Sequence, residues 1–247
     1  MKVLACIPAR YGSTRFAGKV LAKDTGKFLI QHTYERALSA KTIEKVIIAT
    51  DSELVLEACK SFGAPCVMTS DKHQSGTDRI AEAVRDIDVE IVVNLQGDEP
   101  EIEPANIDYL TGLLLKNKDC PMATLAAEFK SKEDVANPNI VKVIIDSSGR
   151  AIYFSRSVIP YDREKNGVGD VKQYLRHLGI YAYRKEFLEK ITALPQSRLE
   201  RIEKLEQLRA LENGYTILVG IVKHTCDGID TQEQYAEFVK HFKKYKG

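Results

Sequence analysis

The sequence predicts an α/β fold with a mostly parallel central sheet. Short apolar or β-branched runs alternate with segments of helical length through the first two-thirds of the chain. This alternation is typical of βαβ units, whose strands lie parallel. The chain has 247 residues, of which 44% are hydrophobic and 29% charged. These values suit one α/β domain with a sizeable core, or one domain with a small appendage.

Apolar runs and capping residues predict the elements of the first part. Residues 3–7 form a short apolar run that ends at Pro8, as expected of a buried strand. Asp51 and Ser52 begin a helix over residues 53–62, and Gly63 ends it. The other expected elements are helices at Leu29–Leu38 and 77–86, and strands at Lys45–Thr50, Cys66–Met68 and Ile91–Asn94.

The later part of the chain has a different pattern. Runs at 141–145 and 151–154 flank Asp146-Ser147-Ser148-Gly149, which predicts a hairpin turn. The remaining expected elements are a strand at 179–183, a charged amphipathic helix at 198–211, a strand at 217–221 and a closing helix at 231–245. We therefore expect one domain, residues 1–247, with a hairpin or dimerisation region within about residues 150–185.

Charge and cysteine content exclude several classes of protein. The 36 Lys and Arg against 35 Asp and Glu leave a net charge of +1, which argues against bulk affinity for nucleic acid or anionic membrane. No apolar run approaches the length of a membrane span, and the N-terminus does not resemble a signal peptide. The cysteines are odd in number, scattered and without a C-x-x-C pair, and are Cys6, Cys59, Cys66, Cys120 and Cys226. Free thiols predict a reducing compartment, so we expect a cytoplasmic protein with no nucleic-acid partner and no membrane insertion.

The segment from Pro8 to Lys19 follows the first predicted strand and holds three cations, two glycines and two hydroxyls. Open α/β sheets bind ligands at this end of their strands. Arginine forks, a lysine charge and glycines that allow close approach all suit phosphate oxygens. The segment is no Walker A loop, because five residues separate Gly12 from Gly18 and Val20 stands where Ser or Thr is required. It predicts a triphosphate cradle, and the alternative is a solvated basic loop.

Two acidic residues complement this cradle. Asp98 follows the strand at Ile91–Asn94, and Asp230 precedes the closing helix. Mg²⁺ takes one or two carboxylates together with substrate phosphates, although Asp230 could instead cap the helix. A metal held by both acids would polarise the α-phosphate for in-line attack, which needs positioning more than a protein nucleophile. The sequence thus predicts a Mg²⁺-dependent nucleotidyltransferase.

Seven motifs in chain order resemble the 3-deoxy-manno-octulosonate cytidylyltransferase family, also called CMP-Kdo synthetases. The resemblance covers nearly the whole chain, and the joint order of the motifs makes it specific. The motifs are Ile7-Pro8-Ala9-Arg10-Tyr11-Gly12-Ser13-Thr14-Arg15, His73-Gln74-Ser75-Gly76-Thr77-Asp78-Arg79, Asn94-Leu95-Gln96-Gly97-Asp98-Glu99-Pro100, Tyr153-Phe154-Ser155-Arg156, Arg176-His177-Leu178-Gly179-Ile180-Tyr181, Leu205-Glu206-Gln207-Leu208-Arg209 and Gly228-Ile229-Asp230-Thr231.

The resemblance implies a reaction, a fold and a set of site residues. The anomeric 2-hydroxyl of Kdo, an eight-carbon sugar acid, would attack the α-phosphorus of CTP, releasing pyrophosphate and CMP-Kdo for lipopolysaccharide biosynthesis. The fold would be the nucleotide-diphospho-sugar transferase α/β/α sandwich, as a homodimer. Matching motifs assign CTP to Arg10, Ser13, Arg15, Lys19, Ser75, Gly76 and Arg79, Mg²⁺ to Asp98 and Asp230, and the sugar acid to Gln96, Arg156, His177, Tyr181, Glu206 and Gln207. Of these, Arg10, Arg15, Lys19, Asp98 and Asp230 would be catalytic.

One loop departs from the family pattern Arg-x-Pro-Gly-Lys-Pro-Leu. Ala17 and Val20 stand where the family has prolines. Proline fixes φ and lowers the entropy cost of ordering a loop. We therefore expect a loop that is more mobile before CTP binds, and a higher KM for CTP.

Other activities fit the same motifs less well. Enzymes that use a sialic acid or 8-amino-Kdo as acceptor would share the fold and chemistry. A non-catalytic nucleotide-sensing module would not need both presumed metal carboxylates. A mononucleotide-binding dehydrogenase is disfavoured, because the G-x-G-x-x-G pattern is absent.

Overall fold

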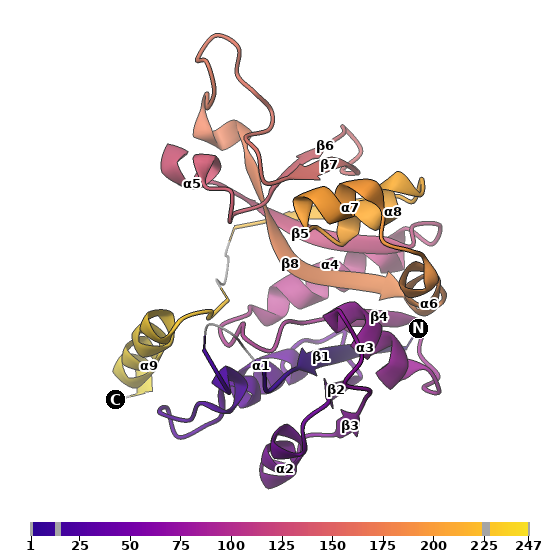
Figure 1. Ribbon diagram of the computed structural model, residues 1–247, viewed down its shortest axis with the longest axis vertical. Coiled ribbons are helices and arrows are strands. Elements are labelled where there is room, and N and C mark those ends of the chain that lie inside the picture. Colours follow the sequence, from indigo (N-terminus) through magenta and orange to yellow (C-terminus); the bar gives the residue numbers. More distant parts are fainter. Residues whose placement is uncertain (1, 13–15, 224–227, 247) are drawn as a thin grey trace. The chain divides into compact units, whose positions relative to one another are not determined.

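The computed structural model describes residues 2–12, 16–223 and 228–246. The chain divides into two compact units, which we call unit 1 and unit 2 (Figure 1). Unit 1 comprises Met1–Asp108 and Cys226–Gly247, and unit 2 comprises Tyr109–Thr225. The division into compact units does not test the expectation that residues 1–247 form one domain, so that expectation stays a prediction.

Unit 1 contains a parallel sheet in the order β3-β2-β1-β4. Its strands are β1 (Val3–Ala9), β2 (Lys45–Thr50), β3 (Cys66–Met68) and β4 (Ile91–Asn94). β1, β2 and β4 are buried along almost their whole length, as expected of parallel strands covered on both faces. Because the strands are parallel, the segments that follow each of them begin at one edge of the sheet.

Helices of unit 1 connect and complete this sheet. They are the 3₁₀ helix η1 (Lys19–Leu21), α1 (Leu29–Leu38), α2 (Glu53–Ser61), α3 (Gly76–Val84) and α9 (Gln232–Lys246), while α4 (Pro104–Lys116) begins in unit 1 and ends in unit 2. Tyr235 and Phe238 of α9 are buried in one cluster with Leu29 and Ile229. The Tyr235 hydroxyl also accepts a hydrogen bond from the Asp24 amide at 2.8 Å. The last helix of the chain thus completes the core of unit 1.

Unit 2 has a mixed sheet centred on β5 (Met122–Glu128). β5 pairs antiparallel with β8 (Leu175–Arg184) and parallel with β9 (Ile217–Val222). β6 (Lys142–Ile145) and β7 (Ala151–Ser155) form an antiparallel hairpin, and β6 also pairs with β8. The helices wholly in unit 2 are α5 (Lys132–Ala136), η2 (Val171–Gln173), α6 (Lys185–Ala193), α7 (Arg198–Glu203) and α8 (Gln207–Glu212).

The helix expected over residues 198–211 is wrong as a single element. The chain forms two short helices, α7 and α8, because Lys204 adopts a left-handed conformation with φ 54° and ends α7. A buried ion pair joins the two helices, with Arg209 donating to both carboxylate oxygens of Glu200 at 2.6 and 2.8 Å. Glu206 and Gln207 therefore lie at the start of α8 rather than in the middle of a long helix.

Most other expected elements are confirmed within one to four residues at each end. The predicted hairpin turn is present, with the Asp146 amide donating to the Arg150 carbonyl at 2.8 Å and Gly149 at φ 75°. Six described elements had no counterpart in the sequence prediction, and they are α4, β5, α5, α6 and the 3₁₀ helices η1 and η2. The α/β class itself is confirmed.

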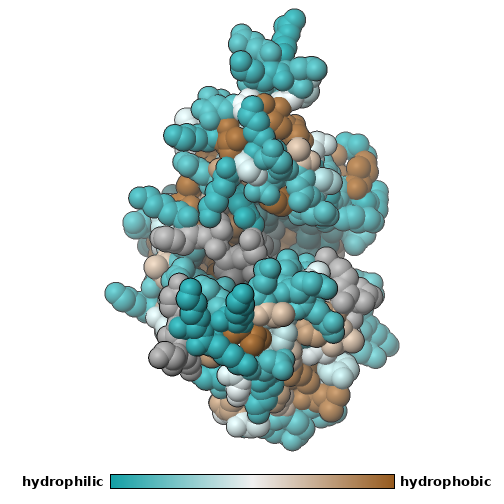
Figure 2. All heavy atoms as spheres, turned by 90° about the vertical axis from the view of Figure 1, so that its left-hand side faces the viewer, coloured by the Kyte–Doolittle hydropathy of each residue, from teal (hydrophilic) through white to brown (hydrophobic). Residues whose placement is uncertain are grey.

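Hydrophilic side chains predominate on the face shown in Figure 2, with hydrophobic ones in small scattered groups. Within the described residues, none of the helices is both long and apolar enough to cross a membrane.

Candidate nucleotide and acceptor sites

The predicted phosphate loop starts inside the sheet and ends at a 3₁₀ turn. β1 continues through Pro8 to Ala9, and the exposed Arg10 follows it. Ser13 and Arg15, both predicted to bind CTP, lie outside the described residues. Gly18 closes the loop at φ 66°, with its amide donating to the Tyr11 carbonyl at 3.2 Å. A Cβ on Gly18 would come within 3.3 Å of the Tyr11 ring, so the turn favours glycine on two counts.

Three predicted motifs meet at Pro8. A Cβ placed on Gly76 would lie 3.2 Å from the Pro8 ring, and one on Gly97 would lie 3.3 Å from the Pro8 carbonyl oxygen. Backbone this close to Pro8 leaves little room for a side chain. The structure therefore brings the start of the phosphate loop, the start of α3 and the turn that carries Asp98 into one small region.

The start of α3 is an ordered helix N-terminus. The Ser75 hydroxyl accepts from the Asp78 amide at 3.1 Å, and the Asp78 carboxylate accepts from the Ser75 amide at 3.2 Å. Helix N-termini attract anions, which agrees with the predicted role of Ser75 and Gly76.

Arg79 has a different environment from the one expected of a ligand contact. Its side chain is 0% exposed, and its guanidinium donates to Asp51 and Thr69 at 2.5 Å each. This pairing fixes α3 to the segments that follow β2 and β3. The nucleotide-binding role of Arg79 stays a prediction, and what the structure gives it is a packing role.

Lys19 joins the two predicted metal carboxylates. Its ammonium lies 2.5 Å from Oδ2 of Asp98 and 3.0 Å from Oδ1 of Asp230, and it also donates to the Ile229 carbonyl at 2.8 Å. Burial disfavours the charge on Lys19, but the two carboxylates outweigh that effect and raise the pKa of Lys19. Residues that lie 79 and 211 positions from Lys19 in sequence thus converge on one cation.

Helix α9 does not depend on Asp230 for its cap. The Thr231 hydroxyl accepts from the Gln234 amide at 3.3 Å, and the Gln234 side chain accepts from the amides of Thr231 and Asp230 at 3.0 and 2.7 Å. Thr231 and Gln234 therefore act as a capping box. The carboxylate of Asp230 accepts from Lys19, and its metal-binding role stays a prediction.

The carboxylate pair fits a hard divalent cation that binds together with substrate phosphates. No group of three or more His, Cys, Asp or Glu side chains that could hold a metal occurs within residues 2–12, 16–223 and 228–246. Two carboxylates suffice for Mg²⁺, since phosphate oxygens and water complete its shell. Asp98 and Asp230 supply oxygen donors of the kind this ion takes, and both already face one positive charge.

A β-bulge in β8 assembles the acceptor-side residues of unit 2. The register between β5 and β8 shifts after Thr124, which pairs with Tyr181 while Leu125 pairs with Leu178. On a regular strand, the Cα atoms of residues four positions apart are about 13 Å apart. Here the rings of His177 and Tyr181 have centroids 5.4 Å apart, because the bulge takes up the residues between them.

Hydrogen bonding fixes the state of His177. The Thr124 hydroxyl donates to the carbonyls of Ile180 or Leu178, at 2.8 and 3.1 Å, so it must accept from Nε2 of His177 at 3.0 Å. Burial among aromatic rings lowers the pKa of His177 to about 3. His177 is therefore a neutral ring protonated on Nε2, and it is suited to exchanging hydrogen bonds rather than to pairing with a carboxylate charge.

The break between α7 and α8 gathers three further predicted acceptor residues. Arg156 donates to the carbonyls of Glu203 and Pro138 at 2.7 and 3.1 Å, which attaches it to the end of α7. Burial and the nearby Glu206 carboxylate raise the pKa of Tyr181, which places Glu206 close to that ring. Gln207 is 5% exposed, and its Nε2 is a buried donor without a hydrogen-bond partner in the described structure. Gln96, the remaining acceptor residue, belongs to unit 1 and donates to Asn94 at 3.2 Å.

Sequence reasoning missed the residues that hold these side chains in place. Thr124 sets the tautomer of His177, and Glu203 accepts from the Arg156 amide and the Ser155 hydroxyl at 3.0 and 2.7 Å. Lys142 is fully buried, and its ammonium donates to the Arg156 carbonyl at 2.6 Å and to two further carbonyls. Burial lowers the pKa of Lys142. The only local signal was a lysine inside a β-branched run, since strand register decides the other contacts.

Comparison with known proteins gives one consistent picture. The model of the cytidylyltransferase family matches residues 4–217. A 3-deoxy-manno-octulosonate cytidylyltransferase from Thermodesulfovibrio yellowstonii is 51% identical, over 94% of this chain and 95% of its own length. One from Solibacter usitatus is 47% identical, over 98% of this chain and 95% of its own.

A solved structure extends the likeness to three dimensions. A CMP:2-keto-3-deoxy-manno-octonic acid synthetase complexed with CTP has 40% identity and a TM-score of 0.93, covering 99% of this chain and all of its own. Likeness over the full length confirms the fold class that the sequence motifs implied. The family resemblance is confirmed as well.

Proposed function

The chain belongs to the 3-deoxy-manno-octulosonate cytidylyltransferase family, and from that premise we propose how its own residues perform the reaction. The enzyme transfers CMP from CTP to the 2-hydroxyl of Kdo and releases pyrophosphate. Sialic-acid and 8-amino-Kdo acceptors are not favoured, because relatives at 43–51% identity share the one name. A place in lipopolysaccharide biosynthesis and, given the free thiols, in the cytoplasm is part of the proposal.

The nucleotide side lies in unit 1. Arg10, Arg15 and Lys19 neutralise the triphosphate, and Ser13 contributes a hydroxyl. The N-terminus of α3, with Ser75 and Gly76, adds backbone donors. Asp98 and Asp230 would hold Mg²⁺, which when bound supplies Lewis-acid polarisation of the α-phosphate.

Five of the proposed acceptor residues, Arg156, His177, Tyr181, Glu206 and Gln207, lie in unit 2, and Gln96 lies in unit 1. Arg156 carries the positive charge that faces the sugar carboxylate. The neutral His177 and Tyr181 exchange hydrogen bonds with hydroxyl groups, as do Glu206 and Gln207. The buried Gln207 Nε2 supports this assignment, since a donor without a partner is costly unless a ligand oxygen satisfies it.

The observation that carries the proposal is the convergence of Asp98 and Asp230 on Lys19. Phosphoryl transfer relies on positioned cations and carboxylate-held metal rather than on a protein nucleophile. A chain that only sensed nucleotide would have no need to bring two distant carboxylates to one point.

Pyrophosphate release tests the reaction directly. The protein is incubated with Mg²⁺, each nucleoside triphosphate in turn, and Kdo, 8-amino-Kdo or a sialic acid. We expect release with CTP and Kdo. If pyrophosphate is released only with a different acceptor, that acceptor is the substrate. If no acceptor gives pyrophosphate release, a nucleotide-sensing module is favoured.

The Asp98→Asn variant tests the metal assignment. An amide keeps the shape of the side chain and removes its charge, so turnover should fall by at least about a hundredfold if Asp98 holds the metal. The exposed Asp88→Asn is the matched control, because the Asp88 side chain is 88% exposed and pairs with Lys2. Near-normal turnover in Asp98→Asn would remove this residue from the mechanism.

A further inference from the structure

Lys19 places a positive charge between the two predicted metal carboxylates. Its side chain is 12% exposed, whereas those of Asp98 and Asp230 are 25% and 41% exposed. Three acceptors surround the ammonium, namely one oxygen from each carboxylate and the Ile229 carbonyl. Lysine has three N–H donors, and these contacts use all of them.

The backbone holds both carboxylates near this point independently of Lys19. The Ile229 amide donates to the Asp98 carbonyl at 2.9 Å, and the Ile229 side chain is buried in the cluster with Leu29 and Tyr235. This strand-like contact ties the segment before Asp230 to the turn that carries Asp98.

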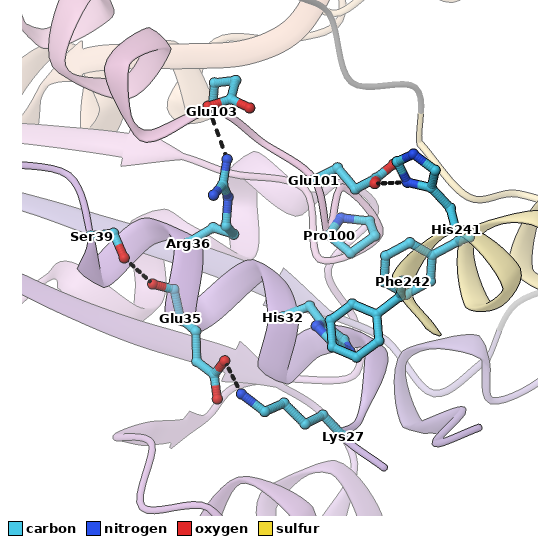
Figure 3. A pocket seen from close by; sticks show the side chains of 11 residues that line it. Lys27, His32, Glu35, Arg36, Ser39, Pro100, Glu101, Glu103, His241 and Phe242 are labelled. Atoms are coloured by element: carbon cyan, nitrogen blue, oxygen red, sulfur yellow. Dashed lines mark hydrogen bonds and ion pairs between the residues drawn. The ribbon is translucent and has the colours of Figure 1, made fainter. Parts of the chain in front are cut away.

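Figure 3 shows how the far side of the same turn is fastened. The turn continues into the wall of a pocket of about 670 Å³ between α1, residues 100–103 and α9. Arg36 of α1 donates to the Ile102 carbonyl at 2.8 Å and pairs with Glu103 at 3.0 Å. His241 of α9 pairs with Glu101 at 3.0 Å. The turn that carries Asp98 is therefore held at both ends, and its carboxylate stays beside the Lys19 ammonium.

We infer that Lys19 is a built-in counter-ion for Asp98 and Asp230. When metal and nucleotide enter together, its ammonium moves from the two carboxylates to the triphosphate. The inference rests on the proposed metal role of Asp98 and Asp230. Lys19 and a divalent cation compete for the same oxygens, so metal alone binds weakly. Phosphate oxygens offer the displaced ammonium a new partner, so metal and nucleotide favour each other's binding. This coupling disfavours a metal-filled site without nucleotide.

Metal binding without nucleotide tests the inference, and Mn²⁺ is the probe because its free concentration can be followed by electron paramagnetic resonance. Lys19→Met removes the competing charge, and we expect it to bind Mn²⁺ at least about tenfold more tightly than the wild type. Lys23→Met is the matched control, since Lys23 is exposed, lies over the Phe28 ring and should leave Mn²⁺ affinity unchanged. Equal or weaker binding by Lys19→Met, or no binding by any variant, would overturn the inference.

A measurement on the wild type avoids dependence on the folding of the variant. With ¹⁵N-labelled lysine, the Lys19 ammonium should give a resonance protected from exchange, identified by its loss in Lys19→Arg. Saturating Mg²⁺ should shift or remove that resonance. An unchanged resonance would contradict the displacement of Lys19 by the metal. Neither measurement uses an acceptor or turnover. A protein that releases no pyrophosphate can still pass both, so failure of the reaction and failure of this inference are separable.

Discussion

At the scale of single residues, the environment of a side chain decides its chemistry more than its identity does. The family resemblance assigns His177 and Arg156 to the sugar acid. The hydrogen bond of His177 to Thr124 and its burial among rings give it a neutral state. A neutral His177 ring and a cationic Arg156 together suit a substrate that presents hydroxyl groups as well as one charge.

This state predicts a specific pH behaviour. His177 takes up a proton near pH 3 in the native protein, against an ordinary value of 6.5, so the unfolded chain is protonated first as pH falls. The contribution of His177 to the free energy of unfolding is therefore unaffected above pH 6.5 and is lost between there and about pH 3. The loss is at most about 1.4 kcal/mol per pH unit.

NMR titration of the His177 ring checks this prediction. The ring should stay neutral from pH 8 down to about 4.5, because protonation would place a charge in a buried site lined by aromatic rings. His241 on α9, whose side chain is 55% exposed, gives a surface histidine resonance for comparison. Titration of His177 near pH 6.5 would contradict the buried neutral assignment.

The two missing prolines predict a second residue-scale effect. Ala17 is exposed, and Val20 lies within η1, where proline is tolerated in the first turn. Ala17→Pro with Val20→Pro should lower the KM for CTP, because less entropy is lost on ordering the loop. Steady-state kinetics gives the answer, with the KM for Kdo as the internal control. A KM for CTP that stays the same or rises would reject this explanation.

The sequence predicted which residues form the site better than it predicted their protonation states and their pairing. Lys19, Asp98 and Asp230 were identifiable from strand ends and from the charge that phosphate and metal require. The neutral form of His177 could not be predicted, because it depends on Thr124 reaching it across a shifted register. The buried pair of Arg79 with Asp51 was equally hidden, since its members lie 28 positions apart.

At the scale of elements, the break between α7 and α8 positions the acceptor side. Lys204 holds a left-handed conformation that costs a non-glycine residue about 1 kcal/mol. The apolar residues Leu199, Ile202, Leu205 and Leu208 keep helical spacing across the break, which is why periodicity predicted one long helix.

Glycine at the break should stabilise the protein. Lys204→Gly relieves the left-handed strain and should raise the free energy of unfolding by about 0.5–1 kcal/mol, observable as a higher urea midpoint. Arg201→Gly, three residues earlier and inside α7, should lower it by about 1 kcal/mol. A loss of stability in both variants would show that the lysine side chain matters more than its backbone angle.

Parallel strands were predicted well, and the elements of unit 2 were predicted less well. β1, β2 and β4 are apolar runs bounded by turns, which is a strong signal. β5 reads Met-Ala-Thr-Leu-Ala-Ala-Glu, and its alanines and methionine carry no strong strand preference. Its position between β8 and β9 comes from tertiary pairing rather than from local sequence.

At the scale of the whole molecule, the family implies a homodimer, and we predict one. Two large apolar side chains of the region near 150–185, Ile152 and Tyr161, are 59% and 60% exposed. Such residues on a monomer surface favour association. Light scattering should give about twice the chain mass of 27.7 kDa at micromolar concentration.

A charge in that region identifies the surface. Ile152→Glu should weaken self-association by at least about tenfold, since a carboxylate is costly in an apolar interface. Lys132→Glu, on α5 outside the region, should not change it. A wild type with the mass of one chain would reject the dimer, and a dimeric Ile152→Glu would move its surface elsewhere.

The return of the last helix to unit 1 has a consequence for synthesis on the ribosome. The ribosome makes Asp230, the Ile229 contact to Asp98 and the aromatic residues of α9 only after the whole of unit 2. Unit 1 therefore cannot complete its core until the segment that follows unit 2 has left the ribosome. A message cut short before Ile229 therefore yields a polypeptide whose unit 1 lacks Asp230 and part of its core.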